Sequence, residues 1–396
     1  MADFDNVPVR RGTNCVKWDL VPEGVLPMWV ADMDFEVAPC IRKAVMDRAA
    51  HGVYGYTAVP RAYHESLCNW LSARHGWKAD PSWVVDTIGV VPAIAACLKA
   101  FTRPGDKVLI MSPVYNCFYY CIRNYGCELV DVPLLTVPTP DGPRYEIDFE
   151  RFEEVAADGV RVMLICSPHN PAGRVWSREE LSRVARICLD NDIIPVCDEI
   201  HCEFVMPGHE FVPFATISEE AERKSVILYA ASKAFNVAGL QLAAIIARDP
   251  ELRSRIDRAV NINETCDVNP FGVVAAMAAY SDEGYAWLRE LNSHLWANYL
   301  YLRELLSALP SVHLYVLEGT YLAWIDIKGI CCRPGGPALT SADVEKSLVE
   351  VEKVRINAGS LYGQEGFLRI NLACPSSMFR DGAGRLLAGL RRLWGK

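Results

Sequence analysis

Four short, nearly continuous apolar segments in the middle of the chain constrain its fold more than any other feature. They begin at Lys107 (KVLIMSP), Arg161 (RVMLICSP), Ile193 (IIPVCDE) and Ser225 (SVILYAAS). Runs of this kind, rich in β-branched residues and without polar alternation, are typical of strands that a parallel sheet buries on both faces. The sequence therefore predicts an α/β protein built around such a sheet.

The segment between the second and third runs, SREELSRVARICLDN, has the pattern of an amphipathic helix. Ser177 and Glu180 stand at capping-box spacing, which favours a helix start at this point. Apolar residues then recur at i, i+3, i+4 and i+7, namely Leu181, Val184, Ala185 and Cys188. A strand, a helix and a second strand in this order form a βαβ unit with a right-handed crossover.

The length of the chain, together with changes in composition and in the order of predicted elements, indicates two lobes. The chain has 396 residues, and single cores stop growing at roughly 250–300 residues. Residues 1–45 are rich in Pro, Gly and Trp, and from about residue 286 the order becomes helix, strand, helix, strand, helix. We predict an N-terminal segment (1–45) that joins the small domain, a large domain (46–285) and a small α+β domain (286–396), with the last boundary marked only by SDEG.

Charge and hydropathy argue against nucleic acid and membranes as partners. The chain carries 40 basic and 49 acidic side chains, a formal net charge of −9, and its basic residues are scattered. Such a surface does not attract phosphate backbones or anionic lipid. No apolar run reaches the length of about 20 residues that a spanning helix needs, and the start, MADFDNVPVRR, lacks the pattern of a signal peptide. We expect a cytoplasmic protein.

The fifteen cysteines do not form a recognisable framework of disulfides or metal ligands. Most stand singly inside apolar segments, where a reduced thiol acts as a small hydrophobe. The two clusters, Cys331–Cys332 and the pair Cys117 and Cys121, have no second pair or histidine at zinc spacing. We therefore expect no metal site.

Polar side chains follow each of the four predicted strands. Tyr115 follows the first, Asn170 the second, Asp198 and His201 the third, and Lys233 the fourth. In an open α/β sheet, ligands bind outside the carboxyl ends of the strands. An aromatic ring, an amide, a carboxylate, an imidazole and an amine are thus expected to converge on one crevice.

This set of side chains suits pyridoxal phosphate. That cofactor needs a lysine for its Schiff base and a carboxylate that keeps its ring nitrogen protonated, roles that Lys233 and Asp198 would take. Asn170 and His201 are within plausible reach of the phenolic oxygen of the ring. Tyr115 could lie flat on the ring face.

Each of these residues also has an ordinary structural interpretation. A lysine after an apolar strand is normally a solvated cap, and Asp198 could begin a helix as its N-cap. The sequence from Asn170 to Gly173 makes a good turn by itself. Tyr115 and His201 are each more often core or rim residues. It is their joint occurrence at successive strand ends that favours a cofactor site.

Several longer motifs make the chain similar to a known family. SPHNPAGRVW, DEIH and SKAFNVAGLQ, which contain Asn170, Asp198 and Lys233, resemble the fold-type I pyridoxal-phosphate enzymes. The closer resemblance is to the MalY/PatB-type cystathionine β-lyase (C–S lyase) branch of the class I/II aminotransferase family. Further motifs fit that branch: KWD from Lys17, LPMWVADMDF from Leu26, YGYT from Tyr54, RHGW from Arg74, GVVPAI from Gly89 and GFLRINLACP from Gly366. The implied fold is a large domain with a mostly parallel seven-stranded sheet between helices and a smaller α+β domain.

The resemblance also implies how the cofactor phosphate is held. Tyr56 would reach into the neighbouring subunit, which requires a homodimer with shared active sites. The backbone amides of Gly89, Val90 and Val91 would cradle the phosphate at a helix start, a physically sensible anion site. Ser232 would add a hydroxyl group.

The substrate-binding residues implied by the resemblance are Arg369, Trp29 and Ala31. Arg369 would grip the substrate carboxylate with two parallel N–H groups, and the backbone around Trp29 to Asp32 would close over the substrate. The chain departs from the common aminotransferase pattern at Ala230, where a serine is usual, and at Gln241, where an arginine is usual. The missing cation favours the lyase branch.

The activity implied by the resemblance is that of a pyridoxal-phosphate-dependent C–S β-lyase. It would act on L-cystathionine or related S-substituted L-cysteines and release thiol, pyruvate and ammonia, with Lys233, Asp198 and Tyr115 as catalytic residues. The alternative is an aminotransferase of an L-amino acid, because the same residues serve both reactions. A binding protein without turnover stays a further alternative, and no GxGxxG motif in a βαβ context supports an oxidoreductase.

Overall fold

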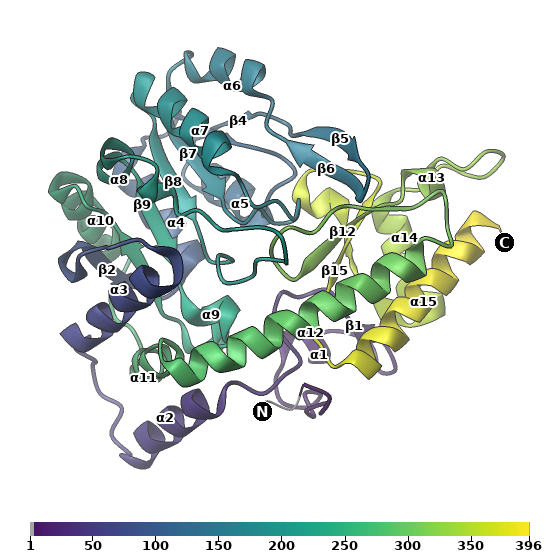
Figure 1. Cartoon of the computed structure of the whole chain (residues 1–396), viewed down its shortest axis with the longest axis horizontal. Helices are drawn as coiled ribbons and strands as arrows, with labels where there is room; N and C mark the ends of the chain where they lie inside the picture. Colours follow the sequence, from purple (N-terminus) through teal and green to yellow (C-terminus); the bar gives the residue numbers. More distant parts are fainter. Residues whose placement is uncertain (1–3, 396) are drawn as a thin grey trace.

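A seven-stranded sheet forms the centre of the computed structural model, which describes residues 4–395 (Figure 1). The strands lie in the order β2, β10, β9, β8, β7, β3, β4. Their bounds are β2 (Val84–Thr87), β10 (Ala243–Ile246), β9 (Val226–Tyr229), β8 (Ile194–Asp198), β7 (Val160–Cys166), β3 (Lys107–Ile110) and β4 (Glu128–Asp131). Only β10 runs antiparallel to its neighbours. The predicted mostly parallel sheet is confirmed, and the four apolar runs are β3, β7, β8 and β9.

Alternate residues of the inner strands enter two different hydrophobic cores, one on each face of the sheet. In β7, Val162 and Leu164 belong to one core, while Met163 and Ile165 belong to the other. The first core includes residues of α4 (Val90–Phe101), α5 (Asn116–Asn124) and α10 (Pro250–Ile262), and the second includes residues of α3 (Arg61–His75), α6 (Phe149–Ala156), α7 (Arg178–Asp190) and α8 (Glu219–Lys224). Burial on both faces explains why the strands lack polar alternation.

The predicted helix between the second and third runs is α7, and it begins as its sequence indicates. Ser177 accepts a hydrogen bond from the backbone N–H of Glu180, and the Glu180 side chain accepts one from the backbone N–H of Ser177. This reciprocal pair satisfies two backbone donors that a helix start otherwise leaves free.

A second, smaller sheet lies beside the first and is antiparallel throughout. Its strand order is β11, β12, β15, β14, and the helices around it are α12 to α15. The bounds are β11 (His313–Leu314), β12 (Leu322–Asp326), β15 (Phe367–Asn371), β14 (Asn357–Ala358), α12 (Asp282–Leu306), α13 (Lys328–Cys331), α14 (Ser341–Ser347) and α15 (Ser376–Trp394). The N-terminal segment joins this part of the chain, because β1 (Leu26–Pro27) pairs with β13 (Val354–Arg355).

The segment SDEG is a helix start and not a linker. We predicted that the helix of this part of the chain starts after about residue 286, but α12 begins at Asp282 and passes through residue 285 without a break. Ser281 caps it by accepting a hydrogen bond from the N–H of Gly284, and Asp282 and Glu283 place negative charge in its first turn, where the helix dipole favours it. The domain boundaries at residues 45 and 285 stay predictions.

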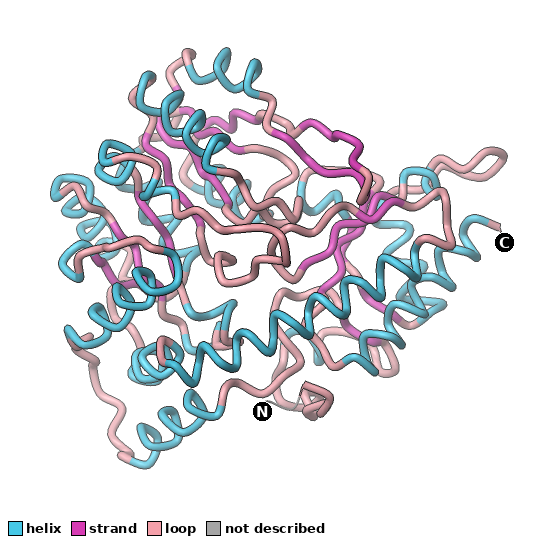
Figure 2. Tube along the Cα trace, viewed as in Figure 1, coloured by secondary structure: helices cyan, strands magenta, loops and turns pink. Residues whose placement is uncertain are grey.

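An extended loop, residues 51–60, connects α2 (Pro39–Ala50) to α3 (Figure 2). The remaining elements are α1 (Val16–Asp19), α9 (Ala231–Ala234), α11 (Pro270–Ala279) and the hairpin of β5 (Leu135–Thr139) and β6 (Gly142–Glu146). Between residues 4 and 395, no helix is long and apolar enough to cross a membrane.

Candidate active site

One cavity of about 460 Å³ lies at the carboxyl ends of the parallel strands and collects nearly all of the predicted site residues. Asp198 ends β8, and Lys233 lies on α9, directly after β9. The predicted residues that line the cavity are Trp29, Ala31, Gly89, Val90, Val91, Tyr115, Asn170, Asp198, His201, Ser232, Lys233 and Arg369. Tyr56 lies outside it, on the loop of residues 51–60, and is 97% exposed.

The amine of Lys233 is partly buried and anchored. Its Nζ donates a hydrogen bond to the backbone oxygen of Ala31 at 2.8 Å. Burial, together with the positive charge of Arg369, lowers the pKa of Lys233 to about 8, although the carboxylates of Asp32 and Asp198 oppose this shift. A lysine with this pKa carries a substantial neutral fraction near physiological pH, as a nucleophile or a general base requires.

Asp198 is a buried carboxyl group that lacks a close cation. Burial raises its pKa to about 6, while the backbone N–H of Ile200, which donates to Oδ1 at 3.2 Å, and the charge of Lys233 act in the opposite direction. A cationic ring nitrogen placed beside it would favour the ionised form. The site thus offers a carboxylate where the predicted cofactor needs one.

His201 and Tyr115 contribute neutral rings. Burial, with the charges of Lys233 and Arg369, lowers the pKa of His201 well below its ordinary value, and the buried Nδ1 of this residue has no hydrogen-bond partner. Burial likewise raises the pKa of Tyr115 well above that of a free phenol. Both residues therefore stay uncharged, and His201 keeps an unused ring nitrogen that a ligand could engage.

The start of α4 provides an anion site without a fixed cation. Gly89 precedes the helix and Val90 and Val91 open it, so their backbone N–H groups are among those that a helix leaves unpaired. Ser232 and Gln241 line the same cavity. A phosphate at this place would be held by backbone amides, a hydroxyl and a neutral amide side chain.

Arg369 is held in position by both parts of the chain. It lies on β15 of the small sheet and is 4% exposed. Nη1 donates to Oδ1 of Asn170 at 3.1 Å, Nη2 donates to the backbone oxygen of Trp29 at 3.1 Å, and the guanidinium lies 4.4 Å from the ring centre of Tyr362. Its buried Nε has no partner. This leaves a donor free for a carboxylate.

Three further residues of the site escaped the sequence analysis. The hydroxyl of Tyr321 donates to the backbone oxygen of Ala31 at 2.8 Å, the same atom that Lys233 uses. Asn357 donates through Nδ2 to the hydroxyl of Tyr362, and both residues line the cavity. No motif marks these residues, because an aromatic ring beside a short apolar strand has the same pattern as a core residue.

A buried ion cluster holds the segment that covers the cavity. Asp34, 1% exposed, accepts from Lys17 Nζ at 2.6 Å and from Arg10 at 2.8 Å, and Arg10 also pairs with Asp32 at 2.5 Å. Lys17 belongs to the motif KWD, and both aspartates belong to LPMWVADMDF. The cluster fixes the N-terminal segment next to Trp29 and Ala31.

Taken together, these residues fit pyridoxal phosphate. The cavity has the volume of an ordinary cofactor site. It offers an amine of lowered pKa, a buried carboxyl group, unpaired backbone amides for a phosphate and an arginine with a free donor. These are the groups that the chemistry of this cofactor requires.

Comparisons with known proteins agree with this geometry. Residues 23–386 match the family described as aminotransferase class I and II. The chain is 38% identical to the cystathionine β-lyase PatB of Bacillus subtilis (strain 168), over 98% of this chain and 100% of PatB. The crystal structure of cystalysin from Treponema denticola, which contains a pyridoxal 5'-phosphate cofactor, has a TM-score of 0.93 at 31% identity and covers 99% of this chain and 100% of cystalysin.

A further solved structure is that of the pyridoxal-phosphate-bound C–S lyase from Staphylococcus hominis, in complex with the inhibitor L-cycloserine. Its TM-score is 0.90 at 30% identity, and the match covers 98% of this chain and 99% of that one. The resemblance that the motifs predicted is thereby confirmed. The chain belongs to the class I and II aminotransferase family.

Proposed function

We propose that this protein is a pyridoxal-phosphate-dependent carbon–sulfur β-lyase that acts on L-cystathionine or related S-substituted L-cysteines. The observation that carries the proposal is the partly buried amine of Lys233, with a pKa of about 8, in one cavity with Asp198 and Arg369. The names of PatB, a cystathionine β-lyase, and of the Staphylococcus hominis C–S lyase support the same chemistry.

The residues that would hold the cofactor come from the seven-stranded sheet and the helices that follow its strands. Lys233 would bind it covalently, and Asp198 would face its ring nitrogen. Tyr115, Asn170 and His201 would contact the ring, and Gly89, Val90, Val91 and Ser232 the phosphate. When bound, pyridoxal phosphate supplies an electron sink that is conjugated to the α-carbon of the substrate.

Arg369 would bind the α-carboxylate of the amino acid. Asn170 and the backbone oxygen of Trp29 already fix its guanidinium, so little rotational freedom is lost when the substrate arrives. Trp29 and Ala31 would border the substrate from the N-terminal segment. This placement would leave the α-hydrogen within reach of Nζ of Lys233.

Lys233 would then remove the α-proton at Nζ. Loss of this proton, followed by cleavage of the Cβ–S bond, releases the thiolate, which takes up a proton to give the thiol. The remaining three-carbon fragment adds one water and yields pyruvate and ammonia. The carbonyl of Ala31 would hold the lysine amine, since it already accepts a hydrogen bond from it.

We further propose a homodimer in which Tyr56 reaches the phosphate site of the partner. Tyr56 is 97% exposed, and its neighbours Val53 and Tyr54 are 63% and 56% exposed. Apolar side chains on a loop that projects from the body are typical of an interface.

We propose the cytoplasm as the compartment, because all fifteen cysteines are free thiols.

The function is tested by mixing the purified protein with L-cystathionine and S-alkyl cysteines in the presence of pyridoxal phosphate. Stoichiometric pyruvate and free thiol without any keto-acid acceptor support the lyase. Keto-acid formation that depends on an added acceptor would assign an aminotransferase instead. A cofactor spectrum that responds to no amino acid would contradict both.

A further inference from the structure

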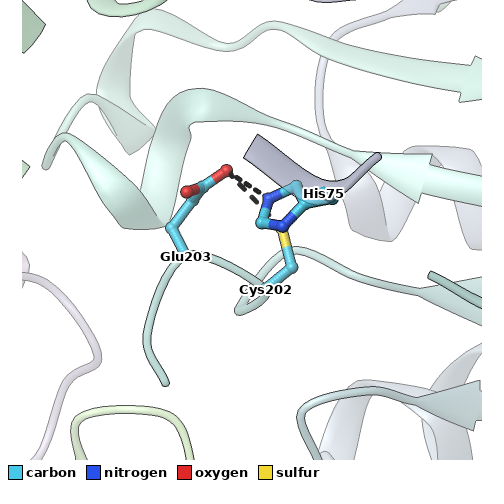
Figure 3. A group of neighbouring side chains, drawn as sticks. All are labelled: His75, Cys202 and Glu203. Carbon is cyan, nitrogen blue, oxygen red and sulfur yellow. Dashed lines mark hydrogen bonds and ion pairs between the residues drawn. The ribbon is translucent and has the colours of Figure 1, made fainter. Parts of the chain in front are cut away.

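A second cluster of reactive side chains lies outside the cofactor cavity (Figure 3). His75 ends α3, and Cys202 and Glu203 lie in the turn that follows β8. One ligand atom from each residue lies within 4.8 Å of the others, and between residues 4 and 395 this is the only such group of three His, Cys, Asp or Glu side chains. None of the three lines the cofactor cavity.

The carboxylate of Glu203 is held by donors on one oxygen only. Oε1 accepts from Trp70 Nε1 at 2.7 Å, from His75 Nε2 at 2.8 Å, from the hydroxyl of Tyr229 at 2.9 Å and from the thiol of Cys202 at 3.9 Å. Oε2 is buried and has no hydrogen-bond partner. A buried carboxylate oxygen without a partner is rare and calls for a ligand.

The cluster opens into a cavity of about 380 Å³. Its walls include His75, Cys202, Glu203, Arg74, His209 and Asn292. Asn292 donates through Nδ2 to the backbone oxygen of Glu203 at 2.8 Å, while its own buried Oδ1 has no partner. A small ion and a water molecule would find both room and unused acceptors here.

Arg74 lies close to Glu203 but makes no hydrogen bond to it. Its buried Nε, which also has no hydrogen-bond partner, lies 3.9 Å from Oε2, and its guanidinium stacks 3.8 Å from the ring centre of Tyr285. Cys202 is 2% exposed. Burial raises the pKa of this thiol well above its ordinary value, so Cys202 is a poor free nucleophile, and only a bound cation would stabilise its thiolate.

We propose that Cys202, His75 and Glu203 bind one zinc ion per chain. One thiolate, one imidazole and one carboxylate are ligands that zinc takes in tetrahedral sites, with water in the fourth position. Oε2 of Glu203 would ligate the ion, while Trp70 and Tyr229 continue to hold Oε1 as outer partners of the ligand. Zinc would replace the hydrogen bond between His75 and Glu203.

This site would fix a segment that also serves the cofactor cavity. Cys202 and Glu203 directly follow His201, which lines that cavity, and their turn follows β8, which ends at Asp198. A metal ion bound to His75 as well would tie this turn to the end of α3. The expectation that the chain holds no metal rested on the spacing of cysteines, and such spacing cannot reveal ligands that only the fold brings together.

The test uses the holoenzyme after removal of bound metal with a chelator, followed by titration with Zn²⁺ and, separately, with Co²⁺. We expect one zinc ion per chain, and with cobalt a thiolate charge-transfer band and the intense visible bands of a tetrahedral site. Cys202→Ser and His75→Gln should each weaken zinc binding at least tenfold. Cys188→Ser is the matched control, since Cys188 is equally buried but lies outside the cluster.

Two results would overturn the proposal. One is a wild-type protein that binds no zinc, or that binds cobalt without the thiolate band. The other is unchanged zinc affinity in Cys202→Ser. Circular dichroism and cofactor content show whether the variants fold, and the cobalt spectrum of the wild type decides the matter even if they do not. A lyase assay has no part in this test, so its result is independent of the proposed function.

Discussion

Single residues of the cofactor cavity derive their properties from burial. Lys233, Asp198 and His201 have pKa values that burial shifts toward the neutral form, to about 8 for the lysine and about 6 for the aspartate. In water the lysine and the aspartate would be almost fully charged at neutral pH, and the histidine would be charged in part. The sequence placed them at strand ends, but only the fold gives them the proton affinity that an acid–base site needs.

Lys233→Ala should remove the visible absorption of the covalently bound cofactor and lower turnover by at least about 10³-fold, because it deletes both the attachment point and the base. Absorption spectra and a pyruvate assay measure the two effects. Lys224→Ala is the control, since Lys224 is exposed at the end of α8. A variant that keeps the visible band would rule out Lys233 as the attachment point.

Glu199→Gln should stabilise the protein at alkaline pH. Burial raises the pKa of Glu199 to about 8, and the backbone N–H of Phe214 donates to Oε1 at 2.9 Å. A raised folded-state pKa gives stability that is complete below the unfolded value, near 4.5, and is lost as the pH rises through about 8. Glutamine stays neutral, so the variant avoids a loss of up to a few kcal/mol at pH values near 9.

The measurement for Glu199→Gln is the thermal midpoint from pH 6 to pH 9. The wild-type midpoint should fall more steeply than that of the variant. Asp190→Asn, an exposed residue at the end of α7, serves as the control and should follow the wild type. Parallel curves for wild type and Glu199→Gln would show that this carboxyl group does not titrate in that range.

Individual elements differ in how well the sequence defines them. The start of α7 was predicted because its capping box is local. The start of α12 was misread because SDEG has the same composition as a linker, and the antiparallel direction of β10 depends on pairing with β2, which is far away in the chain. The start of a helix can be predicted from residues within it, but the pairing of strands that are distant in the chain cannot be predicted from local patterns.

Asp34→Asn should loosen the N-terminal segment over the cavity. The change leaves the buried ammonium of Lys17, 1% exposed, with a neutral partner in place of the carboxylate at 2.6 Å. Loss of one partner of a buried pair typically costs 3–5 kcal/mol. We expect a lower thermal midpoint and a raised KM, because Trp29 and Ala31 belong to the same segment.

The control for Asp34→Asn is Asp47→Asn, which breaks an exposed pair with Lys43 on α2. Surface pairs contribute about 0–1 kcal/mol, so this variant should resemble the wild type. Equal thermal midpoints for the two variants would contradict a structural role of the buried cluster.

At the scale of the whole molecule, the cavity is assembled from three separate stretches of chain. Asp198 and Lys233 come from the end of β8 and from the helix after β9, Arg369 comes from the four-stranded sheet, and Trp29 and Ala31 come from the N-terminal segment. The residues at strand ends and in long motifs were predicted. Tyr321, Tyr362 and the cluster around Glu203 were not, because their partners lie far away in sequence.

The proposed dimer predicts complementation between two inactive variants. If Tyr56 serves the partner's site, a hybrid of Tyr56→Ala and Lys233→Ala subunits contains one intact site. Refolding an equal mixture should then restore about a quarter of the wild-type activity, since half of the dimers are hybrids and each has one intact site of two. Each variant refolded alone is the control. Absence of any recovery in hybrids shown to form would place Tyr56 outside the partner's site.

The free Nε proton of Arg369 sets a condition on what can enter the cavity. Asn170 and the Trp29 carbonyl each accept one N–H of the two Nη atoms, and the Nε proton has no acceptor until an acid group arrives. A decarboxylated analogue, such as a simple thioether amine, would exclude water from the guanidinium without offering an acceptor for its Nε proton. We therefore expect such amines to bind weakly, because they leave a buried hydrogen-bond donor without an acceptor, and no steric barrier against them is needed.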